Sequence, residues 1–383
     1  MRIAPRTMLC GIAWRVHMDV AGDRFEELQE LCTAAGDKPS LAIATAGLVL
    51  DHVYQGRTRE ASQVASDSMA LIESVDDPTL TVGLSFPAIY AKMETNEWRD
   101  VLQWSQRVIE LADGDPSKGN FIIGSPLALA FAHRAMARYC LGRPGWRDDL
   151  RHGLAMARST DPTSRAWVIG YVYFAGVPFG ALRPDDSAVR EIEDALRIAE
   201  RSGDDLAVAF AWLTLGGALV HRPSAPDRDR GEKLLAEVSD VFVRQRYGLS
   251  ELPIVNMYLA RERAGCGVLD DAIPLMRATV DDLFRERQLL LWGIAATAVL
   301  VETLLDRGTD DDVAEAEAAI ERLAAAPADD GLVIRDIWVL RSRALLARAR
   351  GEGVNYLEFV NRYRDMAASL GFEGHIDWAE AMP

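Results

Sequence analysis

Carboxylate pairs are the residues of this sequence that could most readily do chemistry, because adjacent Asp side chains can hold a magnesium–diphosphate group. Asp281 and Asp282 form such a pair, but Arg285 stands at the fourth position, where a further carboxylate is expected. The other acidic clusters lie at predicted helix starts, where carboxylates favour the positive end of the helix dipole. These clusters are Asp148-Asp149, Asp185-Asp186, Asp270-Asp271 and Asp310-Asp311-Asp312. We therefore interpret them as helix caps and predict no metal site.

Other catalytic motifs are missing from the sequence. Residues 114–119 have the wrong order for a phosphate-binding loop, and residues 83–87 fail the last position of Gly-x-Ser-x-Gly. The six histidines and four cysteines are too widely spaced for a metal or redox pair, so we expect four buried thiols. We predict no catalytic residue and no cofactor. The chain should therefore neither hydrolyse ATP nor form cyclic nucleotide.

Composition and charge exclude several classes of protein. Hydrophobic residues make up 49% of the chain and charged residues 26%, which is typical of a folded protein. The net charge of −16 would repel a phosphate backbone, so nucleic acid is not expected as a partner. There is no long apolar run to span a membrane and no signal peptide within residues 1–20, so we predict a cytoplasmic location and no membrane partner.

Helical periodicity runs through the whole chain, whereas the alternation typical of strands is scarce. Between Ser187 and Arg201, apolar residues recur at helical spacing and form one stripe among charged neighbours. Asp77 and Asp161 each precede a proline and predict capped helix starts, and Thr309 predicts a capping box.

Prolines and longer connections indicate where the helices are interrupted. Pro87 should kink the helix that contains it, and Pro178 should break or bend the helix near Tyr171. We expect residues 113–125 and 222–231 to form two longer connections and to be the mobile loops of the chain.

A second periodicity is superimposed on the first, because a polar helix recurs after a short turn about every 40 to 46 residues. These turns begin at Gly56, Asn96, Gly142, Pro184, Pro226, Gly267, Gly308 and Gly351. The pattern predicts an all-α superhelical array of about nine antiparallel helix pairs, resembling degenerate tetratricopeptide repeats. We assign residues 1–383 to one repeat domain, with an N-terminal pair over residues 1–36 and a C-terminal cap over residues 352–383.

The first helix of each pair should line the concave side of such an array. The residues predicted to face this groove are Tyr90, Tyr139, Tyr173, Phe210, Met257, Arg261, Trp338 and Arg341. Two alternatives remain open: these residues bind a ligand or protein segment, or they are core residues. In the first case, the two arginines would favour a carboxylate or phosphate.

Several local sequence segments resemble those of a known family. They are residues 6–11, 25–37, 77–85, 118–126 and 371–383. They resemble the C-terminal half of large actinobacterial signalling proteins. Those proteins join an adenylate/guanylate cyclase domain, an AAA-type ATPase of the signal-transduction class and a helical-repeat region, and some end in a LuxR-type DNA-binding domain. The resemblance carries over no catalytic residue, because the cyclase and ATPase motifs lie in domains outside this sequence.

The resemblance implies a regulatory or sensor arm, whose partner could be a cyclase or ATPase domain. The chain would then be a fragment, the product of a split gene or a stand-alone protein. We therefore expect a non-enzymatic module that binds a protein partner or a small ligand. A stand-alone protein-interaction scaffold and an all-α enzyme with an unrecognised site are the alternatives.

The end of the chain should shield the array from water. A stripe of Leu357, Val360, Tyr363, Met366 and Leu370 predicts an amphipathic last helix. Terminal repeats need such a cap to stay in solution.

Overall fold

The computed structural model describes residues 3–12, 23–288, 290–329 and 331–382, and every regular element in these ranges is helical. The first nine α-helices are α1 (Ile3–Ile12), α2 (Asp23–Ala35), α3 (Lys38–Tyr54), α4 (Thr58–Val75), α5 (Pro78–Glu94), α6 (Trp98–Ala112), α7 (Pro126–Cys140), α8 (Trp146–Ala157) and α9 (Pro162–Ile169). The predicted all-α fold is confirmed.

The second half of the chain continues the same architecture. After a π-helical turn, η2 (Gly170–Phe174), come α10 (Asp186–Ser202), α11 (Asp205–Leu219), α12 (Ala225–Gln245), α13 (Leu252–Gly265), α14 (Leu269–Arg285), α15 (Trp292–Arg307), α16 (Asp310–Ala324), α17 (Val333–Ala349), α18 (Gly353–Leu370) and α19 (Glu373–Glu380). Residues 1–2 and 13–22 of the predicted N-terminal pair lie outside the described residues.

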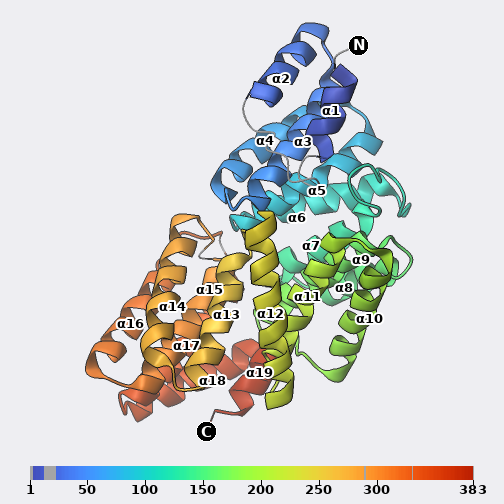
Figure 1. The fold of residues 1–383 in the computed structure, drawn as a ribbon. Coiled ribbons are helices and arrows are strands. Elements are labelled where there is room, and N and C mark those ends of the chain that lie inside the picture. Colours follow the sequence, from blue (N-terminus) through green and yellow to red (C-terminus); the bar gives the residue numbers. More distant parts are fainter. Residues whose placement is uncertain (1–2, 13–22, 289, 330, 383) are drawn as a thin grey trace.

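The helices pack as sequential antiparallel pairs, as expected for a helical-repeat array. Figure 1 shows α1 to α6 at one end of the molecule and the long α12 between its two sides, with α11 against one face and α13 against the other. Apolar stripes supply the contacts. On α10, for example, Ala188, Ile192, Ala195 and Ala199 are buried while the charged residues face outward.

The local helix signals are confirmed. Asp77 accepts hydrogen bonds from the amides of Thr79 and Leu80, and the capping box between Thr309 and Asp312 has both of its bonds. Gly308 ends α15 at φ +72°, a left-handed conformation that favours glycine.

One predicted turn was placed too late in the sequence. Pro226 lies inside the first turn of α12, because Ser224 caps this helix by accepting a hydrogen bond from the amide of Asp227. The loop predicted over residues 222–231 is therefore mostly helix, whereas residues 113–125 do form a connection between α6 and α7.

Pro87 and Pro178 have different effects on the chain around them. α5 continues through Pro87 to Glu94. The predicted break near Tyr171 is present: α9 widens into the π-turn η2, and the helix ends before Pro178.

The thiol prediction holds for three of the four cysteines. Cys10, Cys32 and Cys140 are buried, but Cys266 is exposed because it lies in the turn between α13 and α14.

The N-terminal helices are joined to segments far along the chain. The amide of Leu249 donates to the carbonyl of Tyr54 at 3.0 Å, and the Thr58 hydroxyl donates to the carbonyl of Glu286 at 2.9 Å. Asn96 donates to the carbonyl of Arg287 at 2.6 Å. The superhelix therefore closes on itself, since the turns after α12 and α14 contact the ends of α3, α4 and α5.

This closure buries two carboxyl groups, Glu94 and Glu251. Gln288 donates from its side-chain amide to Glu94, and the Tyr90 hydroxyl donates to Glu251. The Ser250 hydroxyl also donates to Glu251, at 2.7 Å. Burial raises the pKa of both carboxyl groups, and the charge of Glu251 raises the pKa of Glu94 further.

The last helix, α19, packs against the middle of the chain. The amide of His375 donates to the carbonyl of Gly180 at 3.1 Å, and its ring Nε2 lies 3.0 Å from the carbonyl oxygen of Phe179. The amide of Glu373 donates to the carbonyl of Ala181 at 3.2 Å. A second closure thus joins the C-terminal helix to the turn before α10.

The predicted terminal stripe is only partly correct. Val360 and Tyr363 on α18 are buried, but Leu357 is 57% exposed. The reason is that α19 contacts the later turns of α18, through Tyr363 and Arg364. The cap is therefore formed by two helices rather than by one stripe.

Replacing Gly180 by alanine should weaken the docking of α19. Gly180 has φ +68°, and an added Cβ would lie 2.7 Å from the His375 ring. Left-handed backbone costs an alanine about 1 kcal/mol, and overpacking costs about 1–3 kcal/mol more. Gly351→Ala is the matched control, because Gly351 has φ +72° and no atom within 4 Å. Chemical denaturation should show the larger loss for Gly180→Ala, and equal losses would contradict the proposed tight contact.

Candidate ligand-binding cleft

A cleft of about 970 Å³ lies where the second closure brings distant helices together. Its walls come from the turn before α10, the end of α11, and parts of α13, α15, α17 and α19. A second hollow of about 450 Å³ shares Glu302, Asp306, Arg341 and Trp378 with it. The larger cleft has a volume typical of sites for small molecules.

Three of the residues predicted to line a groove do line this cleft: Arg261, Trp338 and Arg341. The others are placed elsewhere. Tyr90 and Met257 are fully buried in the core. Their position follows from the closure of the superhelix, which fills the expected concave surface with packed side chains.

The three aromatic residues predicted to share one groove do not meet. The Tyr139 ring packs against Trp146, Phe179 and Phe372. Phe210 packs against Tyr54, Trp167 and Phe242. Tyr173 donates a hydrogen bond to Glu191 on α10 at 2.8 Å. For Tyr139 and Phe210 the core interpretation is the correct one, because both are buried.

The Arg341 guanidinium packs against two adjacent indole rings on one wall of the cleft. Its guanidinium carbon is 5.3 Å from the centre of the Trp338 ring and 5.2 Å from that of Trp378. Its Nη1 donates to Glu302 on α15, and its side chain is only 12% exposed. The charge is thus held by a carboxylate and two aromatic faces, an arrangement that suits a planar guanidinium.

Arg261 occupies the wall formed by α13. Its guanidinium donates to Glu262 at 2.8 Å and to the carbonyl of Val220, and it lies 5.0 Å from the centre of the Tyr258 ring. His221 packs edge-on against Tyr258. Burial, followed by the charge of Arg261, lowers the pKa of His221 to about 3, so this imidazole is neutral near pH ~7.

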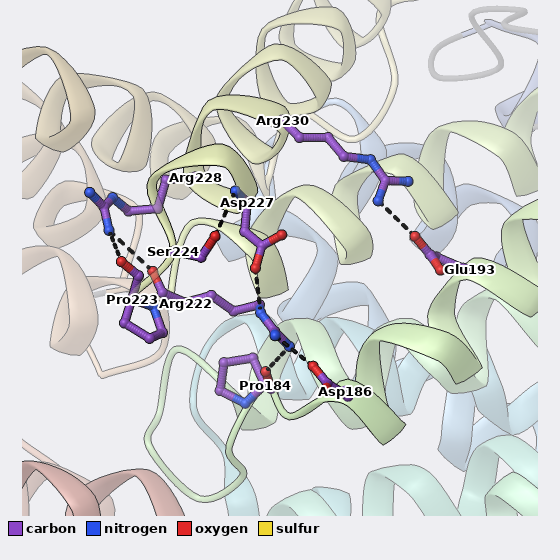
Figure 2. Close-up of polar contacts among 9 residues, drawn as sticks. All are labelled: Pro184, Asp186, Glu193, Arg222, Pro223, Ser224, Asp227, Arg228 and Arg230. Carbon is purple, nitrogen blue, oxygen red and sulfur yellow. Dashed lines mark hydrogen bonds and ion pairs between the residues drawn. The ribbon is translucent and has the colours of Figure 1, made fainter.

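Arg222 ties the rim of the cleft together (Figure 2). Its guanidinium donates to Asp227 at 2.7 Å, to Asp186 at 2.6 Å and to the carbonyl of Pro184 at 3.0 Å. The start of α12 and the start of α10 are therefore held against the end of α11 by a single side chain.

The arginines predicted to attract an anion are already neutralised. Arg261 pairs with Glu262 and Arg341 pairs with Glu302. The sequence did not reveal the partner of Arg341, because Glu302 and Arg341 lie on different helix pairs. An anionic ligand would have to compete with a carboxylate for either guanidinium.

Several cleft residues were missed by sequence analysis. Three of them lie on predicted helices, where neither charge nor an aromatic ring distinguished them from their neighbours: Tyr258, Glu302 and Asp306. Trp378 lies on α19, which the sequence analysis did not recognise as a separate helix within the predicted C-terminal cap. The spacing of Glu302 and Asp306, four residues apart, is the one local pattern that could have placed two of them together.

Within the described ranges, no group of His, Cys, Asp and Glu side chains could hold a metal ion. No described helix has the length and apolar character needed to cross a bilayer. No protein-family model matches the chain, and no curated protein matches it.

Proposed function

We propose that this chain is a non-enzymatic regulatory module that binds a small ligand in the cleft. The observation that carries the proposal is the cleft itself, a hollow of about 970 Å³ built from both arginine-bearing walls and closed by α19. A hollow that combines aromatic faces with a few fixed charges suits small-molecule recognition. The sequence resemblance adds a role in signal transduction, in which the ligand would alter contacts with a cyclase or ATPase domain.

A thermal-shift screen tests the proposal. A ligand at 100 times its Kd should add about 2.7 kcal/mol to the free energy of unfolding and so raise the melting temperature. Ala264→Trp should abolish the shift, because Ala264 lines the cleft and an indole there would fill it. Ala318→Trp on the exposed face of α16 is the matched control and should leave the shift unchanged.

Two outcomes would contradict small-ligand binding in this cleft. Hits that stabilise both tryptophan variants equally would bind elsewhere on the molecule. A broad library without a reproducible hit would favour the alternative of a protein-interaction scaffold.

A further inference from the structure

We propose that the cleft binds an organic cation, with its ammonium group at Asp306, one helical turn from the Arg341-paired Glu302, and its apolar part against Trp378. The inference rests on the proposed function of the cleft as a ligand site and names the chemistry of the ligand. It reverses the charge expected from the sequence, where Arg261 and Arg341 indicated an anion.

The charges that line the cleft are unequally matched. They comprise Arg183, Arg222, Arg261 and Arg341 against Asp185, Asp186, Glu302, Asp306 and Asp377. Each arginine already has a carboxylate partner: Asp377 at 2.7 Å, Asp186 at 2.6 Å, Glu262 at 2.8 Å and Glu302, respectively.

After these pairings two lining carboxylates remain. Asp185 caps α10 by accepting from the amide of Ala188 at 2.8 Å. Asp306 is then the lining carboxylate left with neither an ion pair nor a capping hydrogen bond among the described residues. The leftover charge of the cleft is therefore negative, on a chain whose net charge is −16.

Glu302 and Asp306 lie one turn apart on the same face of α15. Desolvation and then the charge of Glu302 raise the pKa of Asp306, while Arg348 opposes the shift. A cation between the two carboxylates would relieve both effects, since it would replace lost solvation and screen their repulsion.

The adjoining wall already accommodates a positive group. The Arg341 guanidinium packs against both Trp338 and Trp378, whose ring centres are 5.1 Å apart. Trp378 is half-buried and lines both hollows, so part of its surface remains available to a ligand. An ammonium next to an indole and two carboxylates gains from cation–π attraction as well as from charge pairing.

The wall formed by α13 holds a buried hydroxyl. Tyr258 is almost fully buried in that wall, and its hydroxyl lacks a hydrogen-bond partner among the described residues. A hydroxyl oxygen can accept from an N–H group. The cleft is large enough for a ligand that reaches from Trp378 to this wall.

The experiment compares three probes of similar shape on the full chain by ligand-observed NMR titration at constant ionic strength. The probes are phenethylammonium, the neutral 2-phenylethanol and the anion 3-phenylpropionate. We expect phenethylammonium to bind about three- to fivefold more tightly than either of the others, the range expected of one half-exposed ion pair.

Two variants assign the binding to the proposed residues. Asp306→Asn should weaken phenethylammonium by about threefold and leave 2-phenylethanol unchanged. Asp365→Asn removes the same charge from the exposed face of α18 and should change neither Kd. Trp378→Leu should weaken all three probes, because it removes the apolar contact that they share.

The outcomes separate this inference from the proposed function. Tighter binding of 3-phenylpropionate, equal binding of the three probes, or no effect of Asp306→Asn would overturn the cation inference while leaving the cleft as a ligand site. Absence of binding by every probe would also overturn it, and a failed thermal-shift screen would then remove the proposed function as well.

Discussion

Replacing His133 by phenylalanine should stabilise this protein by about 2 kcal/mol more at about pH 5 than at about pH 8. His133 is buried beside Phe86 and Tyr171, and neither of its ring nitrogens has a hydrogen-bond partner among the described residues. Burial lowers its pKa from 6.5 to about 3.

The sign follows from proton binding. As the pH falls below 6.5, the unfolded chain takes up a proton at this histidine, but the folded protein does so only near its own pKa of about 3. Acid therefore favours unfolding by about 1.4 kcal/mol per pH unit for this group. Phenylalanine cannot bind the proton and removes this dependence.

Urea denaturation of both proteins at the two pH values measures the effect. His152→Phe is the control, because His152 is exposed on α8 and its replacement should not change the acid dependence by a comparable amount. His221, which is half-buried, and His375, which is buried, also have lowered pKa values, so some acid sensitivity should remain in the variant. An identical pH dependence in the wild type and His133→Phe would show that His133 has the same pKa in the folded and unfolded states, which would contradict the prediction.

Replacing Glu94 by glutamine should make the stability of the protein less sensitive to a rise in pH above the ordinary glutamate pKa. Burial and the charge of Glu251 raise the pKa of Glu94 in the folded state. The unfolded chain loses this proton above about pH 4.3, whereas the folded protein keeps it to higher pH. The stabilisation is thus complete at low pH and is lost as the pH rises through the folded pKa.

The slope of stability with pH corresponds to the binding of one proton. The free energy of unfolding should fall by up to about 1.4 kcal/mol per pH unit for Glu94, and glutamine should remove that slope. A glutamine at this position can still accept the hydrogen bond from Gln288, so the packing of the closure is preserved.

Thermal and urea denaturation at a series of pH values upward from about pH 4.3 test the prediction. Glu237→Gln on the exposed face of α12 is the control and should leave the slope unchanged. A variant that is less stable than the wild type at every pH would mean that Glu94 is charged in the folded protein and is stabilised by its neighbours.

Local signals in the sequence were sufficient to locate most helices. The caps at Asp77, Asp161 and Thr309 all begin helices where the sequence predicts them. Such signals work because an N-cap side chain bonds to amides only two or three residues away. The turn predicted at Pro226 was placed too late for the same reason, because Ser224, two residues earlier, is the residue that caps α12.

The closures of the superhelix had no local signal. Gly180 and His375 are in contact although they lie far apart in the sequence, and no local pattern around either residue predicts the contact. A hydrophobic pattern shows that Tyr139 or Phe210 is buried or covered, but not whether a ligand or another helix covers it. The aromatic groove therefore failed as a prediction, while the two cleft arginines were identified without their partners.

The walls of the cleft are assembled from residues between Val177 and Trp378, so no short fragment contains them. In an open solenoid each repeat contacts only its neighbours, and unfolding can begin at either end. Here the hydrogen bonds from α19 to residues 179–181 join segments at opposite ends of the cleft-forming region. Forming such non-local contacts requires the closure of a long loop, which slows folding. The cleft should therefore be completed late in folding, so that an intact cleft marks a chain that has finished folding.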